Sequence, residues 1–305
     1  MMRTAVVGAG YLGRFHAQKY AASANCRLVG IADPSAAARD SVGAELNVPT
    51  HADYRELLGQ VDAVSVVTPT PLHFSVAKEF LESGAHVLVE KPMTVTVQEG
   101  EQLVEVARRA KRILQVGHLE RFNAAVRAVQ PLLTVPRFIE SARLAPFKHR
   151  GTDVDVVLDL MIHDIDLILS IVRSPVIAVD AIGSSVFSKE IDIANARLRF
   201  ANGCVANATA SRVSMKTERR LRLFQDDAYV SVDLHQKILT VIRKGAGVGA
   251  DGVPQVAIEE RTYEQGDALQ TEIEAFLVAI NTGQAPPVTG EDGLLALRTA
   301  VSITD

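Results

Sequence analysis

The chain has 305 residues, a length that suits two domains better than one. Apolar residues make up 48% of it, charged residues 22%, and the formal net charge is -4, which is typical of an ordinary globular protein and argues against nucleic acid as a partner. The two cysteines, Cys26 and Cys204, lie far apart and outside any CxxC pair, so neither a disulfide framework nor a zinc site has support.

The chain opens on the apolar run Thr4–Val7, which is too short for the core of a signal peptide. No later stretch approaches the roughly 18 uncharged apolar residues that span a bilayer. The most apolar long segment, Val154–Val172, carries four aspartates and a histidine. We therefore expect a cytoplasmic protein without a membrane partner.

The first 120 residues alternate short apolar runs with alanine-rich, amphipathic segments. Such runs are typical of strands buried on both faces of a parallel sheet. Strands are expected at Thr4–Val7, Leu28–Ala32, Ala63–Val67, His86–Val89 and Ile113–Val116, with helices at Leu12–Ala22, Ser35–Leu46, Leu72–Glu82 and Val97–Ala110. The alternation predicts βαβ units and an α/β Rossmann domain, with a doubly wound parallel sheet, over residues 1–120.

The pattern changes after residue 120. A helix is expected at Phe122–Leu133, a strand at Phe138–Leu144, and a helix up to about Val172 with N-cap chemistry in Gly151-Thr152-Asp153. Closely spaced strands follow at Val176–Ile182, Ala194–Phe200, Cys204–Ser211, Arg219–Phe224, Ala228–Asp233, Ile238–Ile242 and Val256–Ile258, and helices at Ala268–Asn281 and Gly293–Thr304. Residues 121–305 are thus predicted to form an α+β domain with a mostly antiparallel, open-faced sheet.

Two glycine-containing segments of that second half predict turns. Asn202-Gly203 is a strong hairpin signal between two of the strands. The glycine-rich run from Lys244 to Val253 is expected to be a mobile loop.

A GxGxxG motif follows the first expected strand and opens the first expected helix, which is the context that a dinucleotide site requires. Gly8 permits a tight turn, Gly10 lets the backbone approach a pyrophosphate, and Gly13 lets helix and strand pack closely. The helix N-terminus then holds the phosphates. The expected contacts are Gly8, Gly10, Tyr11, Leu12 and Gly13. The alternative is a glycine turn without a ligand.

The second expected strand ends at Asp33, 20 residues beyond Gly13. A carboxylate there can bind both ribose hydroxyls of the adenosine and would repel a 2′-phosphate, so NAD is favoured over NADP as cofactor. NADP stays open as an alternative because Arg39 or a water could offset the charge of Asp33.

The next two strands end in segments that should also face the cofactor, because ligands of a doubly wound sheet lie outside the carboxyl ends of its strands. One segment reads Thr-Pro-Thr-Pro-Leu-His and the other Glu-Lys-Pro. The expected contacts are Thr68, Pro69, Thr70, His73, Glu90, Lys91 and Pro92.

Together, these three motifs resemble those of the glucose–fructose oxidoreductase/inositol dehydrogenase/MocA (Gfo/Idh/MocA) family. Gly117–Asn123 resembles the family's segment that enters the second domain, and Asp159–Asp166 resembles its catalytic helix. The resemblance covers essentially the whole chain. It implies a Rossmann domain followed by an open-faced α/β domain, with the active site between them.

The resemblance also implies three catalytic residues. Lys91 matches the lysine beside the nicotinamide, His163 the general base, and Asp159 the carboxylate one turn earlier. Alcohol oxidation needs a base that titrates near neutrality, and histidine suits that role. A cationic lysine can stabilise the developing alkoxide.

Spacing gives independent support, because Asp159, His163 and Asp166 stand at i, i+4 and i+7 and would share one helix face. The alternatives are a structural histidine, a surface lysine and half of a metal site. No third ligand has matching spacing, so no metal is expected.

The substrate is less well indicated. Basic residues between Arg143 and Gly151, and Arg212 at the end of a strand, suit an anionic substrate such as a nucleotide diphosphate sugar, although a solvated charged loop is the alternative. The expected substrate contacts are His118, Arg121, Asn123, Lys148, Arg150, Asp166 and Arg212.

The segments around these residues are similar to those of family members that oxidise the 3-hydroxyl of UDP-N-acetylglucosamine, so that an aminotransferase can install an amine for lipid A synthesis. This similarity implies the same reaction here. An inositol or simple sugar dehydrogenase is the first alternative, and a non-catalytic sugar or cofactor sensor is the second. The presence of Lys91, Asp159 and His163 favours catalysis, because a sensor could dispense with all three.

The second domain is also expected to mediate self-association. Ala194–Phe200 and Cys204–Ser211 show apolar alternation on a sheet with a face that no predicted helix covers. An apolar face needs burial, which predicts a homodimer or homotetramer through this sheet.

Overall fold

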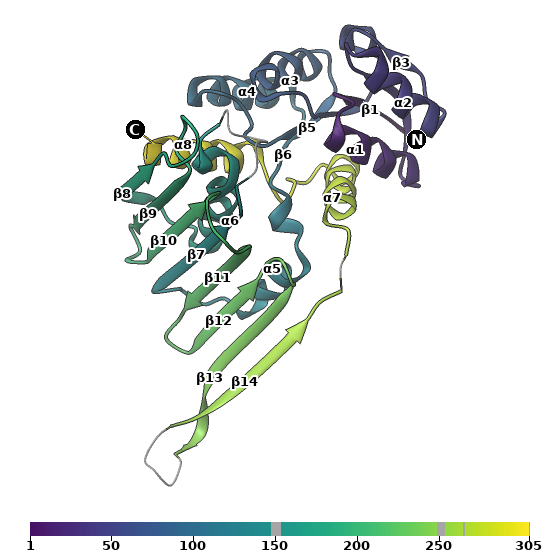
Figure 1. Cartoon of the computed structure of the whole chain (residues 1–305). Helices are drawn as coiled ribbons and strands as arrows, with labels where there is room; N and C mark the ends of the chain where they lie inside the picture. Colours follow the sequence, from purple (N-terminus) through teal and green to yellow (C-terminus); the bar gives the residue numbers. More distant parts are fainter. Residues whose placement is uncertain (148–153, 249–253, 265, 305) are drawn as a thin grey trace. The chain divides into compact units, whose positions relative to one another are not determined.

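A computed structural model describes residues 1–147, 154–248, 254–264 and 266–304 of the chain (Figure 1). The chain divides into two compact units. The first comprises Met1–Leu119 and Asp267–Leu297, and the second comprises Glu120–Gly266 and Arg298–Asp305. Within the described ranges, no helix is both long enough and apolar enough to cross a membrane.

The first unit is built on a six-stranded sheet in which every strand pair is parallel, in the order β3-β2-β1-β4-β5-β6. The strands are β1 (Met2–Val7), β2 (Cys26–Ala32), β3 (Thr50–His51), β4 (Ala63–Val66), β5 (His86–Glu90) and β6 (Leu114–Gly117). This confirms the predicted Rossmann sheet. The direction of strand order reverses between β1 and β4, which is where a doubly wound sheet binds its ligands.

Helices follow the strands of this sheet as their amphipathic patterns predict. They are α1 (Tyr11–Ala22), α2 (Ala36–Leu46), α3 (His73–Glu82) and α4 (Val97–Ala110), with the 3-10 turns η1 (Tyr54–Leu57) and η2 (Thr70–Leu72). Helix α4 begins with a capping box, since Thr96 Oγ1 accepts from the N–H of Glu99 and the Glu99 carboxylate accepts from the N–H of Thr96.

Helix α7 (Ala268–Thr282) packs into the first unit, so the expectation that every residue after 120 belongs to the second domain is wrong. Ile273 and Phe276 are completely buried in a core cluster with residues of α1 and β2. An amphipathic helix buries its apolar face against any matching surface, and its own periodicity does not say which one. The helical pattern was therefore sufficient to predict α7 but not the unit it joins.

The second unit is built on an eight-stranded sheet in the order β14-β13-β12-β11-β7-β10-β9-β8. The strands are β7 (Phe138–Leu144), β8 (Val176–Ser184), β9 (Ile193–Phe200), β10 (Val205–Ser211), β11 (Glu218–Phe224), β12 (Ala228–Asp233), β13 (Ile238–Val248) and β14 (Pro254–Thr262). Among the described strands of this second sheet, only the β7–β10 pair is parallel, which confirms the mostly antiparallel α+β sheet.

The glycine-rich run after Ile242 differs from the expected loop. Residues 244–248 continue β13, which pairs with β14 in a long hairpin that extends past β12 (Figure 1). The remainder of the expected loop, residues 249–253, lies outside the described residues. The Asn202-Gly203 turn between β9 and β10 is present, with Gly203 at φ +87°.

Besides α7, several helical segments precede, interrupt or follow these strands along the chain. The expected helix at 122–133 is the short α5 (Ala124–Val129), flanked by the 3-10 turns η3 (Leu119–Phe122) and η4 (Gln130–Leu132). The expected catalytic helix is a π-helical turn, η5 (Val157–Met161), followed directly by α6 (Ile162–Val172). Helix α8 (Gly290–Thr304) ends the described chain.

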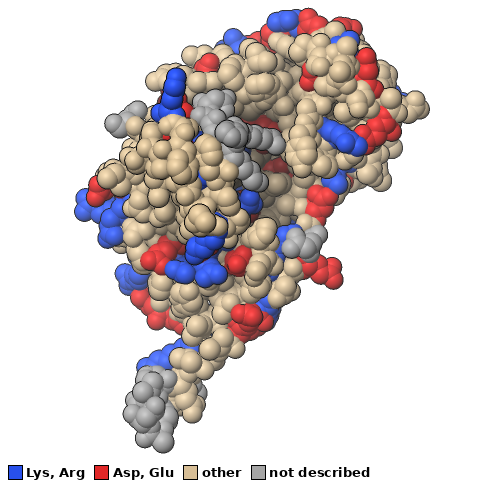
Figure 2. Space-filling model, in the orientation of Figure 1, with Lys and Arg blue, Asp and Glu red and all other residues tan. Residues whose placement is uncertain are grey.

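The outward face of the sheet around β9 and β10 is polar, which corrects the expected apolar face. Ala196 and Leu198 of β9 are completely buried, whereas Asn195 and Arg197, which alternate with them, are exposed. Asn195 Nδ2 donates to Thr209 Oγ1 at 2.8 Å. Basic and acidic side chains are interspersed on the surface of the second unit in the view of Figure 2. Self-association through this sheet therefore stays a prediction, and the apolar outward face from which it was inferred is not found around β9 and β10.

Candidate functional site

The three glycines of the loop between β1 and α1 differ in the space around them. A Cβ atom on Gly8, which has φ +98°, would lie 2.4 Å from the Val67 carbonyl oxygen, and one on Gly13 would lie 1.8 Å from the Gly8 carbonyl oxygen. A Cβ on Gly10 would meet no described atom within 4 Å. The first and third glycines are thus required by packing. The second keeps the backbone open to a ligand.

The start of α1 has the chemistry of a phosphate site. Gly10 is the N-cap, and among the described residues no side chain caps this end and no acidic residue lies in the first turn. The first N–H groups of a helix lack intrahelical acceptors and carry partial positive charge. The turn that contains Tyr11 and Leu12 is therefore suited to an anion such as a pyrophosphate.

Asp33 stands at the end of β2, next to this loop. Its carboxylate accepts from the N–H of Ala9 at 2.7 Å and from the N–H of Ser35 at 2.8 Å. These bonds fix the carboxylate beside a cavity of about 630 Å³, whose lining includes Gly8, Asp33, Thr68 and Pro69. Four of the residues predicted to bind the cofactor are thus brought together around one cavity.

The same cavity has lining residues that the sequence analysis missed, namely Tyr54 and Arg55 in η1. The Arg55 guanidinium lies 4.9 Å from the centre of the Tyr54 ring. A flat aromatic ring and a guanidinium both suit stacking against a base. The two residues follow the two-residue strand β3, which carries no periodic signal, so no pattern marked this segment.

Replacing Asp33 with alanine is expected to weaken NAD binding roughly 10- to 100-fold, because the bonds between a carboxylate and the ribose hydroxyls are lost. The same change should relax discrimination against NADP. Fluorescence titration with NADH and NADPH measures both affinities. Glu82→Ala, at an exposed position of helix α3, is the control and should leave both unchanged. An unaltered NADH/NADPH ratio in Asp33→Ala would discard the assigned role of Asp33.

His73 joins the two segments at the ends of β4 and β5. Its Nε2 lies 2.8 Å from the Thr68 carbonyl oxygen, its Nδ1 lies 2.9 Å from the Pro92 carbonyl oxygen, and the ring is buried. Burial lowers the pKa of His73, although both carbonyls favour the protonated ring. These contacts make His73 a brace between the segments. Direct contacts of His73 and Thr70 with a cofactor stay predictions.

Glu90 directs its carboxylate into the first unit. Its Oε1 lies 3.1 Å from Nε2 of the buried His16, and its Oε2 accepts from the N–H of Lys91 at 3.3 Å. Burial alone would raise the pKa of Glu90, but the hydrogen bond from His16 and the positive charge of Lys91 outweigh it, and the pKa lies below its usual value. Gly117 leaves the space for this carboxylate, since a Cβ there would lie 2.9 Å from Glu90 Oε1. Glu90 thus anchors the segment that presents Lys91.

Glu272 of α7 is a buried carboxyl group near the half-buried Glu90. It is completely buried, and neither of its oxygens has a hydrogen-bond partner among the described residues. Burial raises its pKa well above the usual value, and the charge of Glu90 raises it further. The folded protein therefore binds a proton at Glu272 at pH values where the unfolded chain, with a glutamate pKa of about 4.3, has lost it.

Glu272→Met is expected to stabilise the first unit by about 1–3 kcal/mol near neutral pH, because an unsatisfied buried acid is replaced by an apolar side chain. Wild-type stability should fall as pH rises from about 4.3 to the raised pKa, so the gain in Tm should grow between about pH 5 and pH 8. Thermal unfolding at both pH values tests this. Glu82→Met, at an exposed position of α3, is the control, and a gain that does not depend on pH would contradict the assignment.

The predicted catalytic residues of the second unit lie at the start of its buried helix. Asp159 is in the π-helical turn η5 and His163 in the first turn of α6, and both are half-buried. π-helical turns occur often at functional sites. The cap of this helix is Asp155, whose Oδ1 accepts from the N–H groups of Val157 and Leu158, both at 2.8 Å. The N-cap expected in Gly151-Thr152-Asp153 lies outside the described residues.

Two predicted substrate contacts form an ion pair with each other instead of lying open. Arg121 Nε and Nη2 donate to the two Asp166 oxygens at 2.6 and 2.7 Å, and Asp166 is buried. Asp166 is therefore buried against Arg121 inside its unit. Contact of Arg121 or Asp166 with substrate stays a prediction.

The other predicted substrate contacts are spread over different settings. Asn123 caps α5, its Oδ1 accepting from the N–H of Ala125 at 3.1 Å and its Nδ2 donating to the Leu234 carbonyl oxygen at 2.9 Å. His118 is buried at the end of β6. Arg212 is buried in a polar network described below. Lys148 and Arg150 lie outside the described residues.

Two family profiles match the chain. The profile described as an oxidoreductase family with an NAD-binding Rossmann fold matches residues 2–118, and the profile of the GFO/IDH/MocA C-terminal domain matches residues 109–231. Their order along the chain is that of the two units.

Individual proteins of known structure or activity match over nearly the full length. UDP-N-acetylglucosamine 3-dehydrogenase of Acidithiobacillus ferrooxidans is 41% identical over 303 residues, which cover 99% of this chain and 96% of that protein. A solved structure of the enzyme from that organism matches with a TM-score of 0.94 at 40% identity and covers 99% of this chain and 96% of that one.

More distant matches include inositol dehydrogenases. The NAD(+)-dependent scyllo-inositol 2-dehydrogenase of Bacillus subtilis is 25% identical over 332 residues, covering 100% of this chain and 93% of that protein. A solved scyllo-inositol dehydrogenase from Lactobacillus casei, with NAD(H) and scyllo-inositol bound, has a TM-score of 0.82 at 21% identity and covers 100% of this chain and 96% of that one, a likeness of fold alone.

Proposed function

Because this chain belongs to the Gfo/Idh/MocA oxidoreductase family, we propose that it is an NAD-dependent dehydrogenase that oxidises the 3-hydroxyl of UDP-N-acetylglucosamine to the 3-keto sugar. The observation that carries the proposal is 41% identity to a UDP-N-acetylglucosamine 3-dehydrogenase over 99% of the chain. The inositol dehydrogenases match at 25% identity, so they support the chemistry of alcohol oxidation more than a particular substrate.

Two features of the first unit fit NAD. The uncapped start of α1 beside Gly10 suits the pyrophosphate, and the fixed carboxylate of Asp33 suits two ribose hydroxyls. When bound, NAD supplies the acceptor for the hydride that leaves the sugar carbon. The negative charge of Asp33 disfavours a 2′-phosphate, and we therefore propose NAD in preference to NADP.

Proton removal is assigned to residues of the chain itself. His163, in its neutral form, accepts the proton of the sugar hydroxyl as the hydride leaves. Lys91, as a cation, stabilises the oxygen while negative charge develops on it and orients the hydroxyl. Asp159 orients the substrate or raises the basicity of His163.

The experiment that tests the proposal follows NADH absorbance when enzyme and NAD meet UDP-N-acetylglucosamine, other UDP-sugars, free sugars and inositols. A parallel series contains glutamate and an aminotransferase that consumes 3-keto sugar nucleotides, to draw an unfavourable oxidation forward. A signal with UDP-N-acetylglucosamine alone is the expected result. A signal only with polyols would replace the proposal by an inositol or simple sugar dehydrogenase, and silence throughout would favour a sensor.

A further inference from the structure

A buried ion pair stands beside the start of the helix that carries Asp159 and His163. Arg212 Nε donates to Asp192 Oδ1 at 2.8 Å, and the Arg212 N–H donates to the Asp192 carbonyl oxygen at 2.9 Å. Arg212 is 5% exposed and Asp192 is not exposed at all. A buried ion pair contributes little net stability unless its remaining donors and acceptors are also satisfied. The partners of those remaining groups therefore indicate what the pair does.

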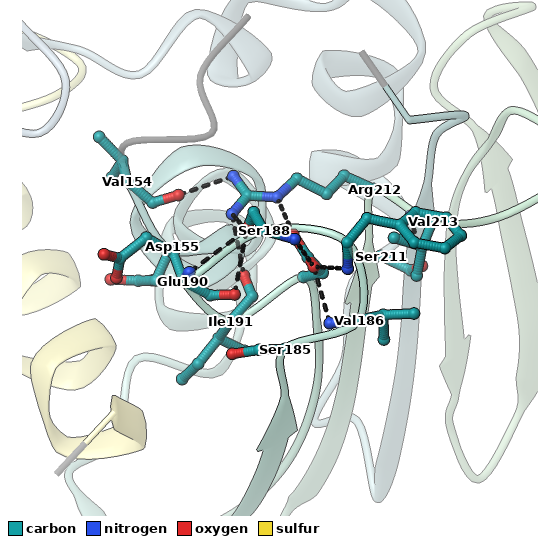
Figure 3. A network of polar contacts seen from close by, with 12 residues as sticks. Val154, Asp155, Ser185, Val186, Ser188, Glu190, Ile191, Ser211, Arg212 and Val213 are labelled. Atoms are coloured by element: carbon teal, nitrogen blue, oxygen red, sulfur yellow. Dashed lines mark hydrogen bonds and ion pairs between the residues drawn. The ribbon is translucent and has the colours of Figure 1, made fainter. Parts of the chain in front are cut away.

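The other nitrogens of Arg212 reach the segment that precedes η5. Nη1 donates to the Val154 carbonyl oxygen at 2.6 Å, and Nη2 donates to the Ile191 carbonyl oxygen at 3.3 Å. Figure 3 shows the guanidinium extended toward Val154, with Ser188 and Ile191 beside it. The Val156 N–H donates to the same Ile191 carbonyl at 2.9 Å. The Arg212 guanidinium thus links Val154 to the Ile191 carbonyl, and the same carbonyl binds the N–H of Val156.

Asp192 organises that loop. Its Oδ2 accepts from three consecutive backbone N–H groups, those of Val186, Phe187 and Ser188, at 2.8, 2.6 and 2.9 Å. Ser188 Oγ donates to Asp192 Oδ1 at 2.7 Å. Burial alone would raise the pKa of Asp192, but the bonds from Arg212 and Ser188 outweigh it and keep the pKa well below its usual value. The carboxylate is therefore charged at neutral pH and, held by these backbone N–H groups, gives Arg212 a fixed negatively charged partner.

The cap of the helix lies between the two tied residues. Asp155, which holds the first turn of η5, is flanked by Val154, bound to Arg212, and Val156, bound to Ile191. A displacement of this cap would move the whole turn that contains Asp159. A mutation far from the reacting atoms that misplaces a catalytic group by about 1 Å can cost on the order of 100-fold in rate.

From this geometry we propose that Arg212 and Asp192 are positioning residues, which set the location of Asp159 and His163 by anchoring the segment that begins their helix. The proposal rests on the catalytic roles proposed above for those two residues. It also replaces the expected role of Arg212 as a direct contact of the substrate diphosphate with an action through the backbone.

The first test is Arg212→Lys, which keeps the charge beside Asp192 but offers one nitrogen where the guanidinium bridges Asp192 and Val154. We expect kcat with UDP-N-acetylglucosamine to fall roughly 10- to 100-fold, with KM and the Kd of NADH within about twofold of wild type. Arg137→Lys is the matched control, because Arg137 also forms a forked pair, with Asp226, but at the exposed surface of the same unit. Its kcat should equal that of wild type.

The second test is rescue of Arg212→Ala by free guanidinium. This variant leaves a space shaped for guanidinium beside Asp192 and the Val154 carbonyl, so millimolar guanidinium chloride should restore part of kcat. Urea has nearly the same shape without the charge and should restore none. A variant that is merely less stable would lose activity in either denaturant, so this measurement separates positioning from a loss of folding.

A third measurement tests, without catalytic turnover, whether Arg212 holds the segment that begins the helix. Hydrogen exchange of residues 154–163 should be faster in Arg212→Lys than in Arg137→Lys. If the wild-type enzyme does not oxidise UDP-N-acetylglucosamine, the proposed function fails. Hydrogen exchange in this segment alone then tests whether Arg212 anchors it. Wild-type kcat in Arg212→Lys, failure of guanidinium to rescue a folded Arg212→Ala, or unchanged exchange would each overturn the proposal.

Discussion

His163→Ala is expected to lower kcat for UDP-N-acetylglucosamine oxidation by about 10²- to 10⁴-fold, because the hydroxyl proton then has no positioned acceptor. NAD binding should change little, since the glycine loop and Asp33, which are assigned to the cofactor, belong to the first unit. Steady-state NADH absorbance measures kcat, and titration of NADH fluorescence measures cofactor binding. The acidic limb of the wild-type pH–rate profile, where the base becomes protonated, should disappear in the variant.

The matched control is His235→Ala, which removes an exposed histidine from a turn of the same unit. It should retain wild-type kcat and the wild-type pH profile. If His163→Ala turns over at neutral pH about as fast as wild type, His163 is not the base, and Asp159 becomes the candidate for that role. A parallel loss of NADH binding would instead indicate a general effect on the protein.

Arg143→Met is expected to cost about 3–5 kcal/mol of the free energy of unfolding of the second unit, because it leaves the buried carboxylate of Asp164 without its cation. Arg143 donates to both oxygens of Asp164, at 2.8 and 3.1 Å, and to Glu120 Oε1 at 2.9 Å. Burial opposes the charge of Arg143, but the two carboxylates outweigh it and raise its pKa. Burial also raises the pKa of Asp164, which Arg143 offsets in part. Urea unfolding, followed separately for each transition, measures the loss.

Two further variants make this result specific. Arg137→Met removes the exposed partner of Asp226 just before β7 in the same unit and should cost at most about 1 kcal/mol. Asp164→Leu added to Arg143→Met should recover much of the loss, because a buried pair replaced on both sides by apolar groups leaves less uncompensated charge. Equal losses at Arg143 and Arg137 would contradict a stabilising role for the buried pair.

Local periodicity was sufficient for most of the elements. The expected bounds of the helix Val97–Ala110 and of the strands Phe138–Leu144 and Ala228–Asp233 are those of α4, β7 and β12. These segments bury one face or both, so the side-chain pattern and the structure follow the same repeat. The two-residue strand β3 escaped detection because it is too short to show a period.

Long-range pairing could not be predicted in the same way. The π-helical turn at Val157–Met161 interrupts the α-helical spacing on which the common face of Asp159, His163 and Asp166 rested. Asp166 is instead buried against Arg121, a partner 45 residues away in the chain. A charged side chain in the sequence carries no sign of whether it meets a ligand or an opposite charge inside the protein.

The sequence by itself therefore determined the two-part architecture, the dinucleotide loop with Asp33, and the family whose motifs carry Lys91, Asp159 and His163. These features are local, since each depends on residue types at fixed short spacings. The tertiary structure decided which unit α7 joins, which face of the eight-stranded sheet is polar, and which charges are paired in the interior. Those outcomes depend on contacts between segments far apart in the chain, and burial makes such contacts energetically decisive.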